Sequence, residues 1–263
     1  MNQQINREKG THGEHWNLVH GGFFSDPIVV APLVHKVREL AGMSRADIIV
    51  DLGGGNGYVL SHILARGVGP GVSLVNLDYS DEQLDAARNA AGIFCVRGSV
   101  DTFSRGDVGR ENDRFLFMMR SVLHYFGEDG LHLTLRHLRR QTKPGEFFVH
   151  QTASFRNKHD AECLNALYQM MGTHKWYPTV DFLCACLAAE GWEVREVLPS
   201  FPLPLMSNDL AHRYQLAQDD ILRISDCLSR DFFVPEEVFK KAEDGFCAFL
   251  HYWIYICTPA MGK

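Results

Sequence analysis

The 263-residue sequence has no apolar run that approaches the ~20 residues of a membrane-spanning helix. Its first ten residues are polar and hold no apolar signal-peptide segment, so we expect no secretory leader. Seven cysteines are scattered along the chain without a C-x-x-C pair, and the closest two are Cys184 and Cys186. This excludes a recognisable disulfide framework or zinc motif and favours the reducing cytoplasm as the compartment.

Basic charge is also scarce. The chain has 26 Lys and Arg against 32 Asp and Glu, a formal net charge of −6 at pH 7. Nucleic acids and anionic membranes normally select a basic surface, so we expect neither as a partner. The histidines lack metal-binding spacings such as H-E-x-x-H, and we expect no metal. Length and an apolar content of 46% fit one large domain, or a domain with a small subdomain.

The most informative stretch is residues 48–58, Ile-Ile-Val-Asp-Leu-Gly-Gly-Gly-Asn-Gly-Tyr. Its β-branched apolar triplet predicts a buried parallel strand. The four glycines predict a tight turn that permits positive φ and brings backbone close to a ligand. Val59, Leu60, Ile63 and Leu64 follow at helical spacing. A strand, a glycine turn and a helix start form the nucleotide-binding corner of a doubly wound α/β fold.

The glycine spacing differs from the dinucleotide fingerprint G-x-G-x-x-G, because Tyr58 stands where the third glycine belongs. Asp51 ends the strand, where its carboxylate would repel a pyrophosphate and suits a cationic ligand. The pattern Asp51-x-Gly53-x-Gly55-x-Gly57 resembles motif I of the S-adenosylmethionine (SAM)-dependent methyltransferases with a Rossmann-like fold. The resemblance covers about residues 27–198 and the last strand. It implies SAM as cofactor, in-line methyl transfer, and S-adenosylhomocysteine (SAH) as product.

The resemblance also implies roles for residues at the ends of the predicted strands. The methionine end of the cofactor would be held by Asp51, Gly53, Gly54, Gly55, Asn56 and Gly57. Asp78, at the end of the next strand, can accept hydrogen bonds from the ribose hydroxyls. The adenine neighbourhood would comprise Tyr79, Gly98, Ser99 and Val100, and the reactive side Arg120 and Ser121. Ser99 stands where the family usually has an acid, so the adenine contact falls to its hydroxyl, to Asp101 or to backbone alone.

The segment after the strand at 114–119 carries the catalytic candidate, His124. A neutral imidazole takes up a proton near pH 7, and an oxygen acceptor must lose one; the alternative is a structural histidine. Candidate acceptor-binding residues are Tyr125, His20 and Tyr168. Neither an Asn/Asp-Pro-Pro-Tyr/Phe tetrad nor a Pro-Cys pair occurs, which argues against methylation of nucleic-acid bases. A small-molecule acceptor is favoured, and its reacting atom (O, N, S or C) stays open.

Two other functions remain open at this point. One is a SAM-binding protein without transferase activity, since the catalytic assignment rests on one histidine. The other is a nicotinamide-dependent oxidoreductase, which would share the fold.

We predict one SAM-binding domain over residues 1–263, with an N-terminal lid and helix at 1–42, a core at 43–198, a helical insert at 199–250 and a final strand at 251–263. Its sheet would be doubly wound, seven-stranded and mostly parallel, with the last strand antiparallel. We expect a helix from Pro27 to about Ala41, and insert helices at 209–227 and 235–249. A homodimer is compatible with the sequence.

Overall fold

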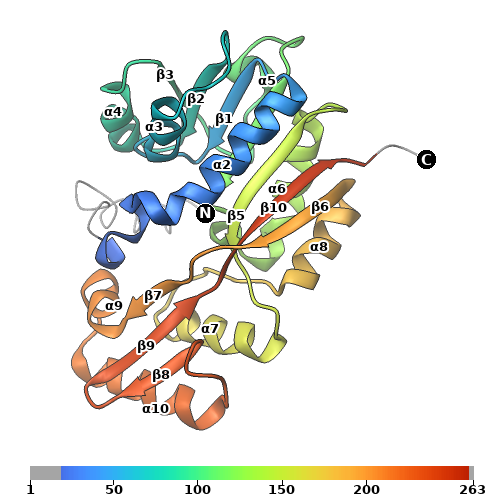
Figure 1. Cartoon of the computed structure of the whole chain (residues 1–263). Coiled ribbons are helices and arrows are strands. Elements are labelled where there is room, and N and C mark those ends of the chain that lie inside the picture. Colours follow the sequence, from blue (N-terminus) through green and yellow to red (C-terminus); the bar gives the residue numbers. More distant parts are fainter. Residues whose placement is uncertain (1–18, 261–263) are drawn as a thin grey trace.

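The computed structural model describes residues 19–260, and side chains from residue 22 onward. It divides into a large lobe built on one sheet and a smaller lobe built on another (Figure 1). The elements in chain order are η1 (Val19–Ser25), α2 (Pro27–Ser44), β1 (Ile48–Leu52), α3 (Tyr58–Ala65), β2 (Ser73–Asp78), α4 (Asp81–Arg88), β3 (Ile93–Arg97), α5 (Arg105–Val108), β4 (Phe115–Arg120), η2 (Leu123–Phe126), α6 (Gly127–Gln141), β5 (Phe147–Ala153), α7 (Lys158–Met170), α8 (Val180–Ala189), β6 (Trp192–Pro199), β7 (Leu203–Met206), α9 (Ser207–Tyr214), α10 (Gln218–Asp231), β8 (Phe239–Ala242), β9 (Gly245–Leu250) and β10 (Tyr252–Pro259). None of the helices within 19–260 is long and apolar enough to cross a membrane.

The large sheet has seven strands in the order β3-β2-β1-β4-β5-β10-β6. Its strands run parallel except β10, which pairs antiparallel with both β5 and β6. This confirms the predicted doubly wound sheet with an antiparallel last strand. The strand order reverses between β1 and β4, and such a switch point opens a crevice at the carboxyl ends of the strands.

Both faces of the large sheet are covered, which explains why its central strands carry uninterrupted apolar runs, such as residues 48–50 and 115–119. On one face, α2 and α3 pack residues such as Leu33 and Leu60 against Ile49. On the other, α6 and α8 pack residues such as Leu135 and Leu187 against the sheet. Helix α2 begins as predicted, because the Asp26 carboxylate accepts a hydrogen bond from the Ile28 amide at 2.7 Å.

The smaller lobe contains a three-stranded antiparallel sheet in the order β7-β9-β8, surrounded by α7, α9 and α10 (Figure 1). The helix predicted at 235–249 is therefore wrong, because β8 and β9 form a hairpin there. Phe246, Ala248 and Leu250 are buried in alternation, which is the period of a strand rather than a helix. The chain passes from β9 into β10 through His251 alone, so the two sheets are directly linked.

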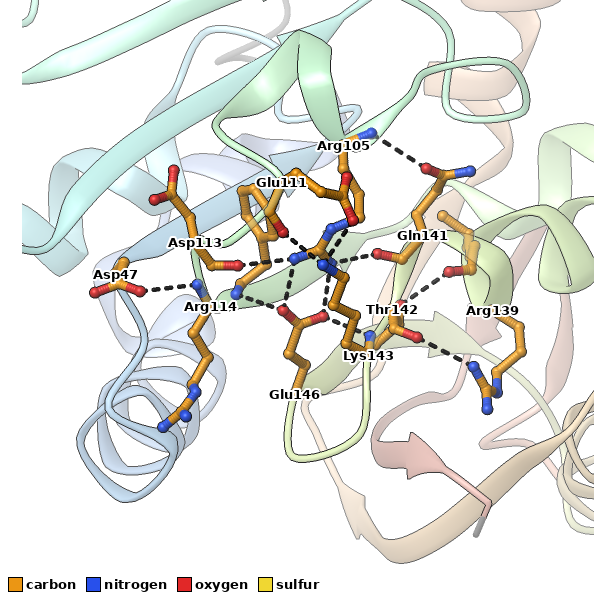
Figure 2. Close-up of polar contacts among 12 residues, drawn as sticks. Asp47, Arg105, Glu111, Asp113, Arg114, Arg139, Gln141, Thr142, Lys143 and Glu146 are labelled. Atoms are coloured by element: carbon orange, nitrogen blue, oxygen red, sulfur yellow. Dashed lines mark hydrogen bonds and ion pairs between the residues drawn. The ribbon is translucent and has the colours of Figure 1, made fainter. Parts of the chain in front are cut away.

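A buried ion pair between Arg105 and Glu146 holds together the amino ends of β4 and β5 (Figure 2). These ends lie away from the crevice, which is at the carboxyl ends of the strands. The Arg105 guanidinium donates to both Glu146 carboxylate oxygens, at 2.8 and 2.9 Å. The same carboxylate accepts from the amides of Phe115 at 2.9 Å and Lys143 at 2.7 Å. Every acceptor site on Glu146 is thus used in fixing the loops that precede the two strands.

Candidate active site

Four strands bring the predicted cofactor residues into one row at the carboxyl edge of the large sheet. In the order of the sheet, β3 is followed by residues 98–100, β2 ends at Asp78, β1 leads into 53–57, and β4 leads into 120–121. Backbone hydrogen bonds join the first three segments: the Gly98 amide donates to Asp78 O at 3.0 Å, and the Gly53 amide to Leu77 O at 2.7 Å. The row crosses the switch point between β1 and β4.

The glycine turn after β1 adopts conformations that disfavour side chains. Gly53, Gly55 and Gly57 have φ of +73°, +57° and +75°. At Gly54 the φ is ordinary, but a Cβ there would lie 2.6 Å from Cγ of Asp51. The turn therefore passes directly over the Asp51 carboxylate, with no room for a side chain between them.

Asp51 is a buried carboxylate, 1% exposed, at the centre of this row. Within the part of the chain that the structure describes, neither of its oxygens has a hydrogen-bond partner. Burial, and secondly the charge of Asp78, raise the pKa of Asp51 from its ordinary 3.8 to about 7, against the lowering effect of Arg120. A buried, unsatisfied carboxylate with a perturbed pKa is typical of a ligand-binding site.

The Asp78 carboxylate already accepts hydrogen bonds from the protein backbone. The amides of Gly55 and Ser80 donate to it, both at 2.8 Å. Burial raises its pKa even though these bonds act in the opposite direction. The Tyr79 amide also acts on this carboxylate, and the lone-pair sites that the three amides leave unused are open to a ligand.

Sequence reasoning missed Asn76, which lies on β2 and is fully buried. Its side-chain amide donates to Gly55 O at 2.8 Å and so ties the glycine turn to β2. A polar residue inside the apolar run 74–77 was the available signal.

Arg120, on the opposite side of Asp51, is shared between the sheet and η1. Its Nε donates to Gln151 Oε1 at 3.0 Å, and one terminal nitrogen donates to Phe24 O at 2.9 Å. The other terminal nitrogen is buried and has no partner among residues 19–260. The Asp51 carboxylate and the Arg120 guanidinium thus lie close together at the switch point. Each has a buried polar atom without a hydrogen-bond partner among residues 19–260. A ligand that carries both an ammonium and a carboxylate would satisfy them both.

The adenine side of the row is less polar than the family pattern implies. Val100 is 6% exposed, whereas Tyr79 is 40% exposed. The Ser99 hydroxyl donates a hydrogen bond to the Asp101 carboxylate, so the two groups left open as alternatives form a single unit.

Beyond Arg120, the chain turns sharply at Ser121, a non-glycine residue with φ of +59°. The Ser121 hydroxyl lies 2.6 Å from the hydroxyl of Tyr252 on β10. His124, in η2, is 6% exposed, and its ring stacks on that of Tyr177 with centroids 5.3 Å apart. The structure therefore places His124 in an aromatic environment beside the end of β4.

Two of the three predicted acceptor-binding residues meet around His124. The Tyr125 ring lies 4.1 Å from the His124 ring, and the buried Tyr168 ring lies 4.9 Å from that of Tyr177. His20 falls in η1, but its side chain lies outside the described residues. Sequence reasoning missed Lys175, Tyr214 and Tyr252, which complete this neighbourhood. No group of histidines, cysteines and acids suited to a metal ion occurs within residues 19–260.

Comparison with known proteins agrees with this geometry. The sequence profile of a family described as "Methyltransferase domain" matches residues 30–197. Among curated proteins, no sequence matches the chain.

Several solved structures share the fold. The YcgJ protein of Bacillus subtilis superposes with a TM-score of 0.61 at 15% identity, over 87% of this chain and 100% of its own. The 1,6-didemethyltoxoflavin-N1-methyltransferase of Burkholderia thailandensis, solved with that compound and SAH, gives 0.57 at 13% identity, over 99% and 89%. A SAM-dependent methyltransferase of Thiobacillus denitrificans, solved with SAH, gives 0.52 at 12%, over 89% and 92%. At these identities the likeness shows a common fold.

Proposed function

The chain belongs to the methyltransferase-domain family, and we propose that it transfers the methyl group of SAM to a small-molecule acceptor and releases SAH. The observation that carries this proposal is the pair of opposite charges at Asp51 and Arg120, each with a buried polar atom that the described residues leave unsatisfied. The methionine end of SAM has a matching ammonium and carboxylate. A dinucleotide pyrophosphate would instead face the Asp51 carboxylate with like charge.

The remaining cofactor contacts follow from the row of strand ends. The acceptor sites that the backbone amides leave unused on the Asp78 carboxylate suit the ribose hydroxyls. The buried Val100 and the half-exposed Tyr79 suit the two faces of the adenine ring, and the Ser99–Asp101 unit its amino group. The glycine turn admits the cofactor because it presents no side chain.

Bound SAM supplies an electrophilic methyl group on a sulfonium. The chain contributes orientation and a partly dry surrounding, which are the largest effects available to a reaction of this kind. The hydroxyls of Ser121 and Tyr252 meet where β4 ends, and this hydrogen-bonded pair would line the site on the side where the methyl group is transferred. His124 is our candidate for the base that accepts a proton from the acceptor.

A small acceptor is supported by the surroundings of the site. His124 lies among side chains of both lobes, in a neighbourhood built from tyrosines rather than from a basic surface. All seven cysteines are free thiols, which supports a reducing, cytoplasmic setting. We treat residues 1–263 as one SAM-binding domain, in which the smaller lobe covers the acceptor side.

The function is tested with SAM that carries a trideuterated methyl group and a small-molecule fraction of a cell extract. We expect SAH to form together with a product heavier by one labelled methyl group, as detected by mass spectrometry. At a SAM concentration below the wild-type Kd, Asp51→Asn should lower turnover by about 10- to 100-fold. Asp226→Asn, a change to an exposed acid paired with Lys241, should leave turnover unchanged. A wild-type protein that binds SAM but forms no SAH with any fraction would support the alternative of a SAM-binding protein without transferase activity.

A further inference from the structure

The side chain of Gln151 is buried beside Arg120 and is hydrogen-bonded at both of its ends. Gln151 lies on β5, opposite Arg120 in the pairing with β4, and only 1% of it is exposed. Its Oε1 accepts from Arg120 Nε at 3.0 Å, and its Nε2 donates to the Ser200 hydroxyl at 2.7 Å. Because an arginine can only donate, the Gln151 oxygen has to face it, and the orientation of this amide is fixed.

These contacts set the direction of the Arg120 guanidinium. The group is a planar, rigid fork, so two hydrogen bonds determine where all of its nitrogens lie. One bond runs from Nε to Gln151, and the other runs from a terminal nitrogen to Phe24 O at 2.9 Å. The guanidinium carbon also lies 5.2 Å from the centroid of the Phe24 ring. The second terminal nitrogen is left buried, without a partner among residues 19–260.

Asp51 and Arg120 are opposite charges that act on each other without a hydrogen bond between them. Burial and the charge of Asp78 raise the pKa of Asp51, and Arg120 lowers it. Burial lowers the pKa of Arg120, and Asp51 is among the groups that raise it. Yet neither oxygen of Asp51 has a hydrogen-bond partner in the described part of the chain. A direct ion pair would offset part of the cost of burying this carboxylate, so the contacts of Arg120 hold the two groups apart.

We propose that Gln151 is a positioning residue for the cofactor: it holds Arg120 apart from Asp51, so that both charges stay available to the carboxylate and the ammonium of SAM. The proposal rests on the proposed function and adds a residue that acts through Arg120. Opposite charges that bonded to each other would be neutralised before the cofactor arrived. A binding group that is fixed beforehand in its productive direction lowers the cost of binding.

The side chain of Gln151 can be tested separately from its backbone. The Gln151 carbonyl accepts from the Ser121 amide at 2.8 Å and so holds the turn after β4. Every substitution keeps this carbonyl, so only the contacts with Arg120 and Ser200 change. Gln151→Met removes both polar ends of a side chain of similar size. Gln151→Glu keeps an oxygen that can accept from Arg120 Nε.

The first readout is the pH dependence of SAH binding, measured by calorimetric titration. In the wild type, SAH binding should weaken about tenfold from pH 8 to pH 6, because Asp51 takes up a proton with a pKa of about 7. In Gln151→Met the released Arg120 would bond to Asp51 and lower the pKa of that acid by about 1–3 units. The change from pH 8 to pH 6 should then be about twofold or less. Gln151→Glu should keep a dependence at least as steep as that of the wild type, since Arg120 stays in place.

The second readout compares SAH with two compounds that lack parts of it. Decarboxylated SAH keeps the ammonium, and 5′-methylthioadenosine has neither charged group. The wild type should bind SAH about 10- to 100-fold more tightly than decarboxylated SAH, because a charge-assisted hydrogen bond is lost with the carboxylate. In Gln151→Met the two affinities should become nearly equal, because Arg120 no longer points at the carboxylate. Methylthioadenosine should bind equally to both proteins, which shows that the fold and the nucleoside contacts are intact.

Gln218→Met, the same change at an exposed glutamine at the start of α10, serves as the matched control. Loss of both the pH dependence and the preference for SAH in Gln151→Met supports the proposal. Retention of either one overturns it and leaves the proposed function standing.

If Gln151→Met binds no methylthioadenosine, Ser200→Ala takes its place, because it removes the hydroxyl that accepts from Gln151. Smaller changes of both readouts in the same direction would support the proposal, and wild-type values would overturn it. Absence of SAH binding by the wild-type protein would overturn the proposed function itself.

Discussion

Replacing Asp51 with asparagine should stabilise the protein without cofactor while weakening its hold on SAM. The raised pKa, about 7 against an ordinary 3.8, means that the folded protein retains a proton there that the unfolded chain has released. The free energy of unfolding therefore falls as pH rises from about 4 to about 7, and the loss is complete above that range. Three pKa units correspond to about 4 kcal/mol, the largest gain that an isosteric, neutral asparagine side chain could give at pH 8.

Cofactor binding should show the opposite dependence. The ammonium of SAM or SAH pairs with the ionised carboxylate, so protonation of Asp51 competes with binding. With a pKa of about 7, the wild-type Kd should rise about tenfold from pH 8 to pH 6 and about a hundredfold by pH 5. In Asp51→Asn we expect a flat pH profile, with affinity at pH 8 reduced by about 10- to 100-fold because a charge-assisted hydrogen bond is lost.

The two effects are measured by urea unfolding without cofactor and by calorimetric titration with SAH, both between pH 5 and 8.5. Asp226→Asn is the matched control, since that acid is exposed and distant in the fold from β1. If Asp51→Asn is no more stable than the wild type at pH 8, and its SAH affinity keeps the wild-type pH slope, the reasoning about this carboxylate is refuted.

Three further predictions concern other parts of the fold. Asp78→Ala should weaken SAH binding at least tenfold, since two ribose contacts and the acceptor of the Gly55 amide are lost together; unchanged calorimetric affinity would remove the ribose assignment. Glu146→Gln should lower the free energy of unfolding by about 3–5 kcal/mol, because it leaves Arg105 buried without its counter-charge. Its SAH affinity should be normal, and a large loss would mean that the ion pair supports the site. His124→Asn should lower kcat and remove the acidic limb of its pH profile at normal SAH affinity, whereas an unaltered profile would identify this histidine as structural.

The large sheet could be predicted because its signals are local. Ile48–Val50 and the glycines that follow define a strand and a turn without reference to the rest of the chain. Parallel strands are buried on both faces, and short apolar runs between helices identify them. The row of strand-end residues then follows from topology, since the carboxyl ends of parallel strands meet at one edge.

The hairpin of the smaller lobe was not predictable in the same way. Pro235 with the two acids after it is a sound helix start signal, yet the chain forms only a turn there before β8. The alternate burial along β9 has meaning only against β7 and β8, which pair with it. Tertiary pairing therefore overrode a local preference.

The acceptor side depends on still more distant contacts. Tyr252 reads as an ordinary residue of the last strand, and its meeting with Ser121 requires β10 to lie next to β5. Lys175 appears as one basic residue in an aromatic-rich segment until α9 brings Tyr214 to its ammonium. The spacing of residues within one segment cannot predict such contacts between distant segments.

Above all, we propose that the opposite charges of Asp51 and Arg120 at the switch point bind SAM. Calorimetric titration of the purified protein with SAH, SAM and NAD tests this most directly. We predict micromolar binding of SAH and SAM, and no heat from NAD. Binding of NAD without SAH would contradict the assignment of Asp51 to a cationic cofactor, and binding of none of the three would contradict a functional cofactor site.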